Sequence, residues 1–560
     1  MSCHVYSQKD VGGGRRTRVS RRGVLAWFVW GLVVTAVAGG TADGATYYLD
    51  ANGGNDGWPG TSLLPWRSLA KAQAAAKFGD TILMRNGNYG PFVADRSFFA
   101  PYPESDDVPL PAGQLWVTYQ AIPGQDHVDV DYIEYKFGGQ LYTVAHAFKG
   151  INLTKPKGRC VFAWGVVGLL LEDITLSGTT NVDLLATAMS YHSTVELKGL
   201  NNDITISGCE IQGGYRGIYA DGVNNNVRIS GCNIHNTGVD KIMYASGTNI
   251  LIENCRLHGP PLLPNEHPDC IQFYTAADTY GPSARATNIT IRGNMMYDHP
   301  SQGVWTDGSY LVNVVFENNL MYNLGNYEWR VYSVHGGLIR NNTIVGGAGR
   351  NTGIIVYGSD QNSNITVVNN IFACPYWGST AVMDYHDHNV FTDSSADSPG
   401  DEESNSYEFP SMEAAIAALF TDAASADYSL ATGSKAIDFG DAGSNPGVDL
   451  AGAQRDSSPD AGCYEYGSAG APPEDPPAQD PPAQDPPAED PPAEDPPAED
   501  PPAEDPPAED PPAEDPPLDD TEDNFWDDLI QKAKDERLRR QNSPSQVYRR
   551  IQELRRRHKH

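Results

Sequence analysis

Residues 204–211 read ITISGCEI, and the same pattern returns as VRISGCNI at 227–234 and as ILIENCRL at 250–257. Four more copies begin at residues 289, 314, 337 and 365. Each copy alternates apolar and polar residues, breaks at glycine or asparagine, and then resumes with apolar residues. Such a pattern predicts a short strand, a tight bend and a second short strand.

The spacing of the copies predicts how the strands are connected. Neighbouring copies begin 23 residues apart in three of the six intervals. So short a turn of chain cannot hold a crossover helix, so each strand should pair with its counterpart in the next coil of a parallel solenoid. A leucine-rich repeat is a poor alternative, because its Leu-rich consensus and its helical half are missing.

The position after the bend predicts an inward-facing ladder. Cys209, Cys232 and Cys255 occupy it in the first three copies, and asparagine occupies it in the later ones. Asparagine amides stacked at strand spacing can hydrogen-bond to each other and so be satisfied inside. Stacked cysteines would stand about 4.8 Å apart, whereas the Cβ atoms of a disulfide prefer about 3.8 Å. We therefore predict three buried, reduced thiols.

Segments on both sides of the repeats complete the pattern. Residues 47–56 (YYLDANGGND) lead to PWRSLAKA at 65–72, which would form a short helix with an apolar face over the open end of the core. Near the other end, residues 460–466 read DAGCYEY. With the repeats, these segments resemble the pectate-lyase-like right-handed β-helix superfamily over about residues 46–467. The resemblance implies an all-β fold, a right-handed parallel β-helix solenoid with an N-terminal capping helix, in an exported protein that handles polysaccharide.

The two ends of the chain differ from this domain. Residues 1–45 join an arginine-rich start to the apolar stretch 24–38, and predict a signal peptide and hence a secreted, periplasmic or cell-surface protein; an uncleaved membrane anchor is the alternative. Residues 468–520 repeat Asp-Pro-Pro-Ala-Glu and predict a disordered acidic spacer. Residues 521–560 predict short basic C-terminal helices. These helices pack on themselves, fold back on the spacer, or contact an anionic membrane or envelope.

The charge of the chain excludes one class of partner. The formal net charge is −33, and residues 474–515 hold 16 acidic and no basic side chains. Binding to nucleic acid needs a concentrated basic face, so we expect no nucleic-acid partner. We expect instead an acidic polysaccharide, bound by a monomer. No Cys-X-X-Cys pair is present, so zinc has no support in the sequence.

A second series of strands follows the bends and carries the candidate site. Ile242, Ile271, Val304 and Val331 should be inward residues of consecutive coils, so the polar residues just before them should share one cleft. We assign catalytic roles to Lys241, His267, Asp269, Arg330 and Asp307, substrate binding to Arg216, Tyr219, Tyr244, Gln272, Trp305 and Tyr332, and calcium binding to Asp240 and Asp269.

Three interpretations of this cluster are open. In β-elimination on a uronic acid, a cation such as Ca²⁺ neutralises the carboxylate, and Lys241, Arg330 or His267 removes the C5 proton; the resemblance favours this reaction. In glycoside hydrolysis, two carboxylates among Asp240, Asp269 and Asp307 act as acid and base or nucleophile. The third interpretation is a non-catalytic surface protein that binds carbohydrate.

Overall fold

The computed structural model describes one body of the chain. It covers residues 44–99, 101, 115–155, 158–187, 193–263, 266–274, 285–306, 310–325, 329–346, 354–356, 362–372, 376–377, 383–392 and 403–468. All of these belong to a unit, Met1–Pro477, that is separate from Ala478–His560. Almost all of the predicted signal peptide, and the predicted spacer and basic tail, lie outside the described residues.

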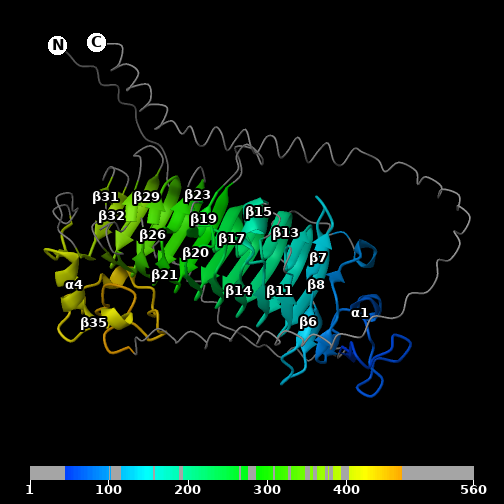
Figure 1. Ribbon diagram of the computed structural model, residues 1–560. Helices are drawn as coiled ribbons and strands as arrows, with labels where there is room; N and C mark the ends of the chain where they lie inside the picture. The colour runs from blue at the N-terminus through cyan, green and yellow to red at the C-terminus, as the bar shows by residue number, and fades with distance from the viewer. Residues whose placement is uncertain are drawn as a thin grey trace, which may run out of the picture. The chain divides into compact units, whose positions relative to one another are not determined.

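The described residues form a stack of parallel coils (Figure 1). They contain a 21-stranded and a 13-stranded parallel sheet, and the larger sheet consists of two series of strands, so each full coil has three faces. In three coils the first two faces share one long bent strand, namely β13 (Val195–Ser207), β15 (Ile218–Ser230) and β17 (Ile242–Glu253). The predicted parallel β-helix solenoid is therefore confirmed.

The remaining strands fall into the three faces as follows. Face 1 holds β4 (Phe92–Val93), β7 (Ile133–Lys136), β10 (Val161–Trp164), β19 (Asp269–Phe273), β22 (Gln302–Thr306), β25 (Trp329–Val331), β28 (Ile354–Val356) and β31 (Tyr376–Trp377). Face 2 holds β1 (Thr46–Leu49), β2 (Thr81–Met84), β5 (Val117–Ala121), β8 (Tyr142–Lys149), β11 (Val166–Glu172), β20 (Ala286–Arg292), β23 (Leu311–Glu317), β26 (Val334–Arg340), β29 (Ser363–Val368) and β32 (Met383–Asp387). Face 3 holds β3 (Gly87–Asn88), β6 (Val128–Val130), β9 (Asn152–Thr154), β12 (Thr175–Ser177), β14 (Glu210–Gln212), β16 (Asn233–His235), β18 (Arg256–His258), β21 (Met295–His299), β24 (Leu320–Leu324), β27 (Thr343–Val345), β30 (Ile371–Phe372), β33 (Asn389–Phe391) and β34 (Ser406–Glu408).

The bend between faces 2 and 3 explains the repeat. Gly208 and Asn254 adopt φ values of 62° and 54°, the left-handed region that glycine and asparagine tolerate best. The residue after the bend then points inward. In the later coils the amides of Asn294, Asn319, Asn342, Asn370 and Asn389 bond to each other at 2.9–3.1 Å. The predicted asparagine ladder is confirmed, and it satisfies the polar groups at the bend without water.

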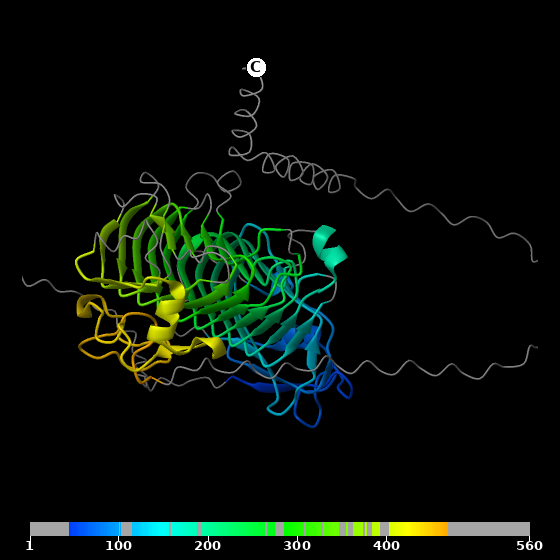
Figure 2. The same cartoon turned by 60° about the vertical axis from the view of Figure 1, so that its left-hand side comes forward.

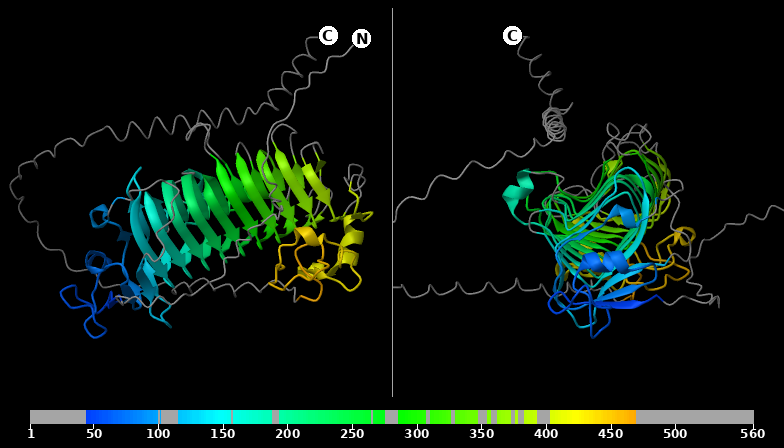
Figure 3. Two further views of the ribbon diagram at one scale, coloured as in Figure 1. Left: turned by 180° about the vertical axis from the view of Figure 1, so that it is seen from behind. Right: turned by 90° about the vertical axis from the view of Figure 1, so that its right-hand side faces the viewer.

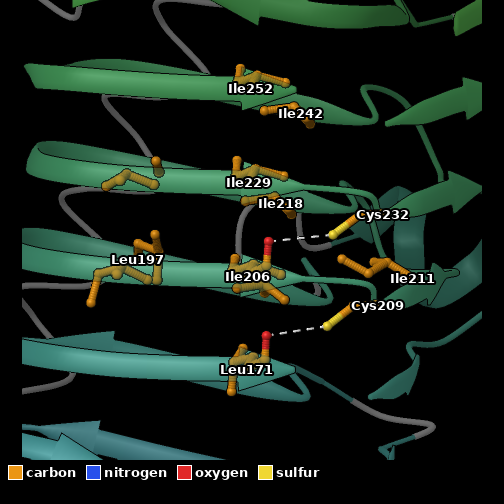
Figure 4. Close-up of a cluster of buried hydrophobic side chains, with 14 of the residues drawn as sticks. Leu171, Leu197, Ile206, Cys209, Ile211, Ile218, Ile229, Cys232, Ile242 and Ile252 are labelled. Carbon is orange, nitrogen blue, oxygen red and sulfur yellow. Dashed lines mark hydrogen bonds between the residues drawn. The ribbon is translucent and has the colours of Figure 1, made fainter. Parts of the chain in front are cut away.

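The cysteine ladder is also confirmed. Cys209, Cys232 and Cys255 are buried and unpaired. The Sγ atoms of Cys209 and Cys232 lie 3.6 and 3.5 Å from the carbonyl oxygens of Leu171 and Ile206, between columns of buried isoleucines (Figure 4). Within the described ranges every cysteine is a free, buried thiol.

Short helices lie at the ends of the coils and, in the case of α2 (Val182–Thr187), beside them (Figure 2). At the N-terminal end, α1 (Leu69–Ala75) begins at Ser68, which caps the amide of Lys71, and it buries Leu69 and Ala72. This confirms the predicted capping helix. Within the described ranges, the other helices are η1 (Arg96–Phe98), α2 (Val182–Thr187), α4 (Met412–Leu419), η4 (Ala423–Ser425) and η5 (Ala442–Ser444). Among the described residues, no helix is long and apolar enough to cross a membrane.

Residues 403–468 cover part of face 3 in the last coils (Figure 2). Tyr428, in the hairpin of β35 (Phe420–Asp422) and β36 (Asp427–Leu430), continues a stack of rings from Tyr297 and Tyr322. Arg455 is buried and donates to the carbonyl groups of Asp460 and Gly462 and to the side-chain oxygen of Asn318. The segment therefore closes a second apolar core on the outside of the coils (Figure 3).

Candidate functional site

The candidate site lies where the face 1 strands begin. Asp269 pairs in register with Gln302 of the next coil, and its backbone amide donates to Oδ1 of Asp240 in the previous coil at 3.1 Å. Asp240 in turn accepts from Nε of Arg216, one coil further back, at 2.9 Å. The stacking of coils thus brings together four polar side chains that span 87 positions in the sequence (216 to 302).

His267 and Asp269 form a hydrogen-bonded pair at the centre of this row. Nδ1 of His267 lies 3.2 Å from Oδ2 of Asp269, and Nε2 lies 3.3 Å from Nε2 of Gln302. The neutral imidazole that suits both contacts donates from Nδ1 to the carboxylate and accepts from the amide at Nε2. The edge of the ring meets Trp305, with 4.8 Å between centroids. His267 is 52% exposed, whereas the Asp269 side chain is fully buried.

Burial sets the protonation of the acids in this row. It raises the pKa of Asp269 to about 7, and the charge of Asp240 adds to the rise, while the hydrogen bond with His267 opposes it. The same hydrogen bond raises the pKa of His267 above its ordinary value. Burial also raises the pKa of Asp240, although Arg216 opposes that rise. The pKa values of both partners are therefore raised, that of Asp269 chiefly by burial and that of His267 chiefly by their shared hydrogen bond.

Lys241 does not reach the surface of this site. Its side chain is fully buried, and Nζ donates to the hydroxyl group of Thr237 at 3.1 Å. Burial lowers the pKa of Lys241 to about 8, and the groups that oppose this fall are Cys270 and Asp240. Side chains alternate between inward and outward only within a strand, and Lys241 lies in the turn before β17. Its side chain can therefore point inward although the next residue, Ile242, does so too.

Tyr244 is not an outward substrate-binding residue, and that prediction is wrong. It is fully buried, and its hydroxyl group donates to the carbonyl oxygen of Asn224 at 2.5 Å. Because side chains alternate along a strand, Tyr244 shares the inward side of β17 with Ile242.

The predicted column of inward residues holds for three of its four members. Ile242 pairs with Ile271, and Ile271 pairs with Val304, but Val304 pairs with Trp329 and not with Val331. The prediction for Val331 is wrong by two residues, because the step from Val304 to its partner is 25 residues, as between the repeat copies at 289 and 314, and not the 27 that the prediction assumed. Arg330 consequently lies beside Trp305 in register. The side chain of Arg330 lies outside the described residues.

Three other predicted binding residues, Tyr219, Gln272 and Trp305, occupy the outer row of face 1, and Arg216 and Tyr332 flank its strands. Gln272 pairs with Trp305, and Tyr219 pairs with Met243, which pairs with Gln272. The guanidinium of Arg216 lies 4.8 Å from the ring centres of both Tyr215 and Tyr219. Partly buried Tyr332 donates its backbone amide to the hydroxyl group of Thr306 at 2.9 Å. Asp307 lies outside the described residues.

The described acids do not make a calcium site by themselves. Both oxygens of Asp240 are used by Arg216 and by the amide of Asp269, and one oxygen of Asp269 is used by His267. Ca²⁺ takes six to eight oxygen ligands. Within the part of the chain that the structure describes, no group of three acidic, His or Cys side chains could hold a metal ion. Calcium binding by Asp240 and Asp269 stays a prediction that needs ligands from elsewhere.

Two further residues of the site were not assigned a role from the sequence. Gln302 is 2% exposed and contacts His267. His299 is buried with neither ring nitrogen bonded to a described residue, and burial lowers its pKa to about 3, so it is neutral. The available signal was their position: Gln302 is the first residue of β22, one coil beyond Asp269, and His299 ends β21 three residues earlier.

Comparisons with known proteins give one family match and several distant structural matches. Residues 174–373 match a family model described as the right handed beta helix region. No curated protein matches the sequence at a significant level. Among solved structures, a complex of XylC with xylose is 11% identical over 65% of this chain and 86% of its own, with a TM-score of 0.37. Pectate lyase Pel9A is 15% identical over 75% and 96%, with a TM-score of 0.34. PfbA, a surface adhesin of Streptococcus pneumoniae, is 12% identical over 55% and 78%, with a TM-score of 0.34.

The family match lies within the observed coils. Residues 174–373 run from the coil of β12 to the coil of β30, and in this range the strands pair in parallel from coil to coil. This part of the chain is similar to the right handed beta helix family, and the described coils have that fold.

Proposed function

We propose that this protein cleaves an acidic polysaccharide by β-elimination, with His267 as the base. The observation that supports the proposal is the hydrogen bond between the half-exposed imidazole ring of His267 and the buried carboxylate of Asp269. Asp269 fixes the tautomer in which Nδ1 carries the proton, so Nε2 has the lone pair that a base needs. Asp269 acts through His267 and is a positioning residue.

The residues of this row can supply each step of the elimination. Nε2 of His267 leaves its contact with Gln302 and takes the C5 proton of a uronic acid. The electrons of that bond form the C4–C5 double bond, and the C4–O bond breaks. The leaving oxygen takes up a proton, which the imidazolium can return. Trp305 offers a ring face or edge against a sugar, and Arg330, its neighbour in register, is the candidate partner for the uronate carboxylate.

Glycoside hydrolysis is the second candidate, and a specific observation favours it. Asp269 has a pKa of about 7 because of burial, so it can donate a proton at neutral pH. Asp240 is the nearest second carboxylate, since its Oδ1 accepts from the amide of Asp269. Hydrolases need such a pair of acids. Its weakness here is that Asp240 is held by Arg216 and buried.

The chain ends carry further parts of the proposal. We propose that residues 1–45 direct export, that residues 46–467 act as one β-helix domain and as a monomer, and that residues 468–520 are a spacer. The basic residues of 521–560 would then hold the protein near an anionic membrane or envelope. A non-catalytic carbohydrate-binding protein is the outcome if no polysaccharide is cleaved.

The test follows products from pectate and alginate incubated with the purified protein. β-Elimination gives an unsaturated sugar that absorbs in the ultraviolet, together with new reducing ends, whereas hydrolysis gives the reducing ends alone. We expect the absorbance to rise with wild-type protein and with His258→Gln, a control on face 3, and to be lost with His267→Gln. New reducing ends without ultraviolet absorbance would show that the protein is a hydrolase and not a lyase. Binding of the polysaccharide without cleavage would show that it is a non-catalytic carbohydrate-binding protein.

A further inference from the structure

A tryptophan and two lysines form a row on face 1, several coils before the row of His267. Trp164, the last residue of β10, pairs in register with Lys136 of β7 and with Lys198 of β13. Paired positions of neighbouring coils stand about 4.8 Å apart, so the three residues follow one another along the stack. Figure 1 labels β7 and β13, and β10 lies between them.

All three side chains point away from the core. The residue before each of them is buried and faces inward: Tyr135, Ala163 and Leu197. Because side chains alternate along a strand, the row itself faces outward. Lys136 is exposed, and Trp164 and Lys198 are partly buried. A ligand on the outer surface of face 1 can therefore contact all three side chains.

The next coil holds the ring of Trp164 in place. The pyrrole part of the ring lies against Gly199, where φ is 67° and a Cβ atom would stand 2.5 Å from Nε1. The indole N–H has no hydrogen-bond partner among the described residues, and unlike that of Trp329 it is not buried. Trp164 thus offers a fixed aromatic ring and an accessible hydrogen-bond donor.

The two lysines of this row have no ion-pair partner among the described residues. Arg159, at the start of the same coil of face 1, is by contrast paired with Glu196 at 3.1 Å. Glu134 and Asp221 lie on the same outer surface, but neither comes within ion-pair distance of the lysines. The row therefore places an ammonium group on each side of an aromatic ring, and both charges can meet an anionic ligand.

We propose that Lys136, Trp164 and Lys198 form a distal subsite for an acidic sugar chain. One sugar ring would pack on Trp164, and the carboxylates of neighbouring units would pair with the two ammonium groups. The coil spacing of about 4.8 Å is close to the length of one sugar unit in an extended polysaccharide, so successive units can meet successive coils. An uncharged sugar chain would leave both lysines without a partner.

The distal subsite rests on the proposed function, because the same sugar chain has to reach His267. Trp305, whose ring His267 contacts, is also an outward residue of face 1. It lies five coils beyond Trp164, which is roughly 24 Å along the stack. A sugar chain that occupies both places must be several units long, so the distal subsite should act on polymers and not on short oligomers.

Calorimetric titration of the full-length His267→Gln variant measures binding without cleavage. The probes are oligogalacturonate and oligomannuronate long enough to span both tryptophans, and the disaccharide of each. In this background, Trp164→Ala should weaken binding of a long oligomer roughly tenfold. Lys198→Gln should weaken it roughly threefold, and neither change should affect the disaccharide.

Matched controls and an uncharged probe complete the test. Trp58→Ala, in the loop before α1, and Lys149→Gln, on face 2, should leave binding of the long oligomer unchanged. Methyl-esterified oligogalacturonate should bind more weakly than the acid, and Lys198→Gln should not weaken it further. All variants should keep the melting temperature, since the replaced side chains face outward.

The outcomes separate the distal subsite from the proposed cleavage. Equal binding of the long oligomer with and without Trp164→Ala and Lys198→Gln would overturn the subsite, even where the wild type cleaves polysaccharide. Absence of binding by both long acidic oligomers would also overturn it. Binding that depends on Trp164 and Lys198, in a protein whose wild type cleaves nothing, would support the subsite and refute the cleavage.

Discussion

Replacing Lys241 with methionine should stabilise the protein. The ordinary lysine pKa of 10.5 falls to about 8 in the fold because burial disfavours the ammonium. Since a tenfold change in a proton equilibrium is worth about 1.4 kcal/mol, this fall corresponds to roughly 3 kcal/mol of unfavourable free energy at pH 7. Methionine keeps the length and volume of the side chain without the charge.

The loss of one hydrogen bond offsets only part of this gain. The bond from Nζ of Lys241 to Thr237 contributes about 1 kcal/mol. The Thr237 hydroxyl stays satisfied without Lys241, because it also donates to the carbonyl oxygen of Val239 at 2.8 Å. Asp240 likewise keeps its partner Arg216. The net gain should therefore be about 2 kcal/mol.

The pH dependence of stability tests independently whether Lys241 destabilises the folded protein. Lys241 has a lower pKa in the folded state than in the unfolded state, so the unfolded state binds more protons between about pH 8 and 10.5. The stability of the wild type should rise over this window relative to Lys241→Met, and the gap between them should close near pH 10.5. Below pH 8 the gap should stay constant.

Equilibrium denaturation at several pH values measures both the stability gained by Lys241→Met at pH 7 and the change of this gain with pH. Thr237→Val is the matched control, because it keeps the ammonium and removes its hydrogen-bond acceptor, and it should destabilise the protein. A Lys241→Met variant that is less stable than the wild type at pH 7, with a gap that does not change up to pH 10.5, would refute the reasoning. It would mean that Lys241 is hydrated or paired in solution.

Four further predictions concern the fold. Asn342→Leu should lower the free energy of unfolding by about 2 to 3 kcal/mol, measured by denaturation, because the amide of Asn319 loses its acceptor. Arg455→Met should expose residues 403–468 to proteolysis before the coils, because the carbonyl groups of Asp460 and Gly462 each lose one of their donors. The thiols of Cys209 and its neighbours in the ladder should react with a thiol reagent only after denaturation. A chain that ends at Ser468 should keep its melting temperature in calorimetry; a clear fall would show that the tail packs on the coils.

The fold could be predicted because its signals are local and repeated. Each bend needs a residue that tolerates positive φ, such as Gly208, and each ladder needs the same side chain at the same position, such as Asn342. Counterparts of these two residues recur from coil to coil, so the repeat is visible in the sequence. The capping helix could be predicted for the same reason, since a capping serine and an apolar face lie within a few residues.

The site could be predicted only in part. His267, Asp269 and Trp305 meet as expected, because the coils between them keep the register. The placement of Lys241 was missed, because it lies in a turn where alternation gives no direction. The register of Arg330 was missed because the prediction placed Val331, two residues too late, in the column that Trp329 occupies. Tyr244 was assigned to substrate binding, which requires an outward side chain. It lies two residues after the inward Ile242, so the alternation along the strand already predicted an inward side chain.

The most direct test of the account is the initial rate at which unsaturated product forms from an acidic polysaccharide, compared between wild type, His267→Gln and His258→Gln. We predict equal rates for wild type and His258→Gln, and a rate at least about a hundredfold lower for His267→Gln, the usual worth of a general base. The melting temperature of all three should be the same. Undiminished product formation by His267→Gln would contradict the account and move the base to another residue.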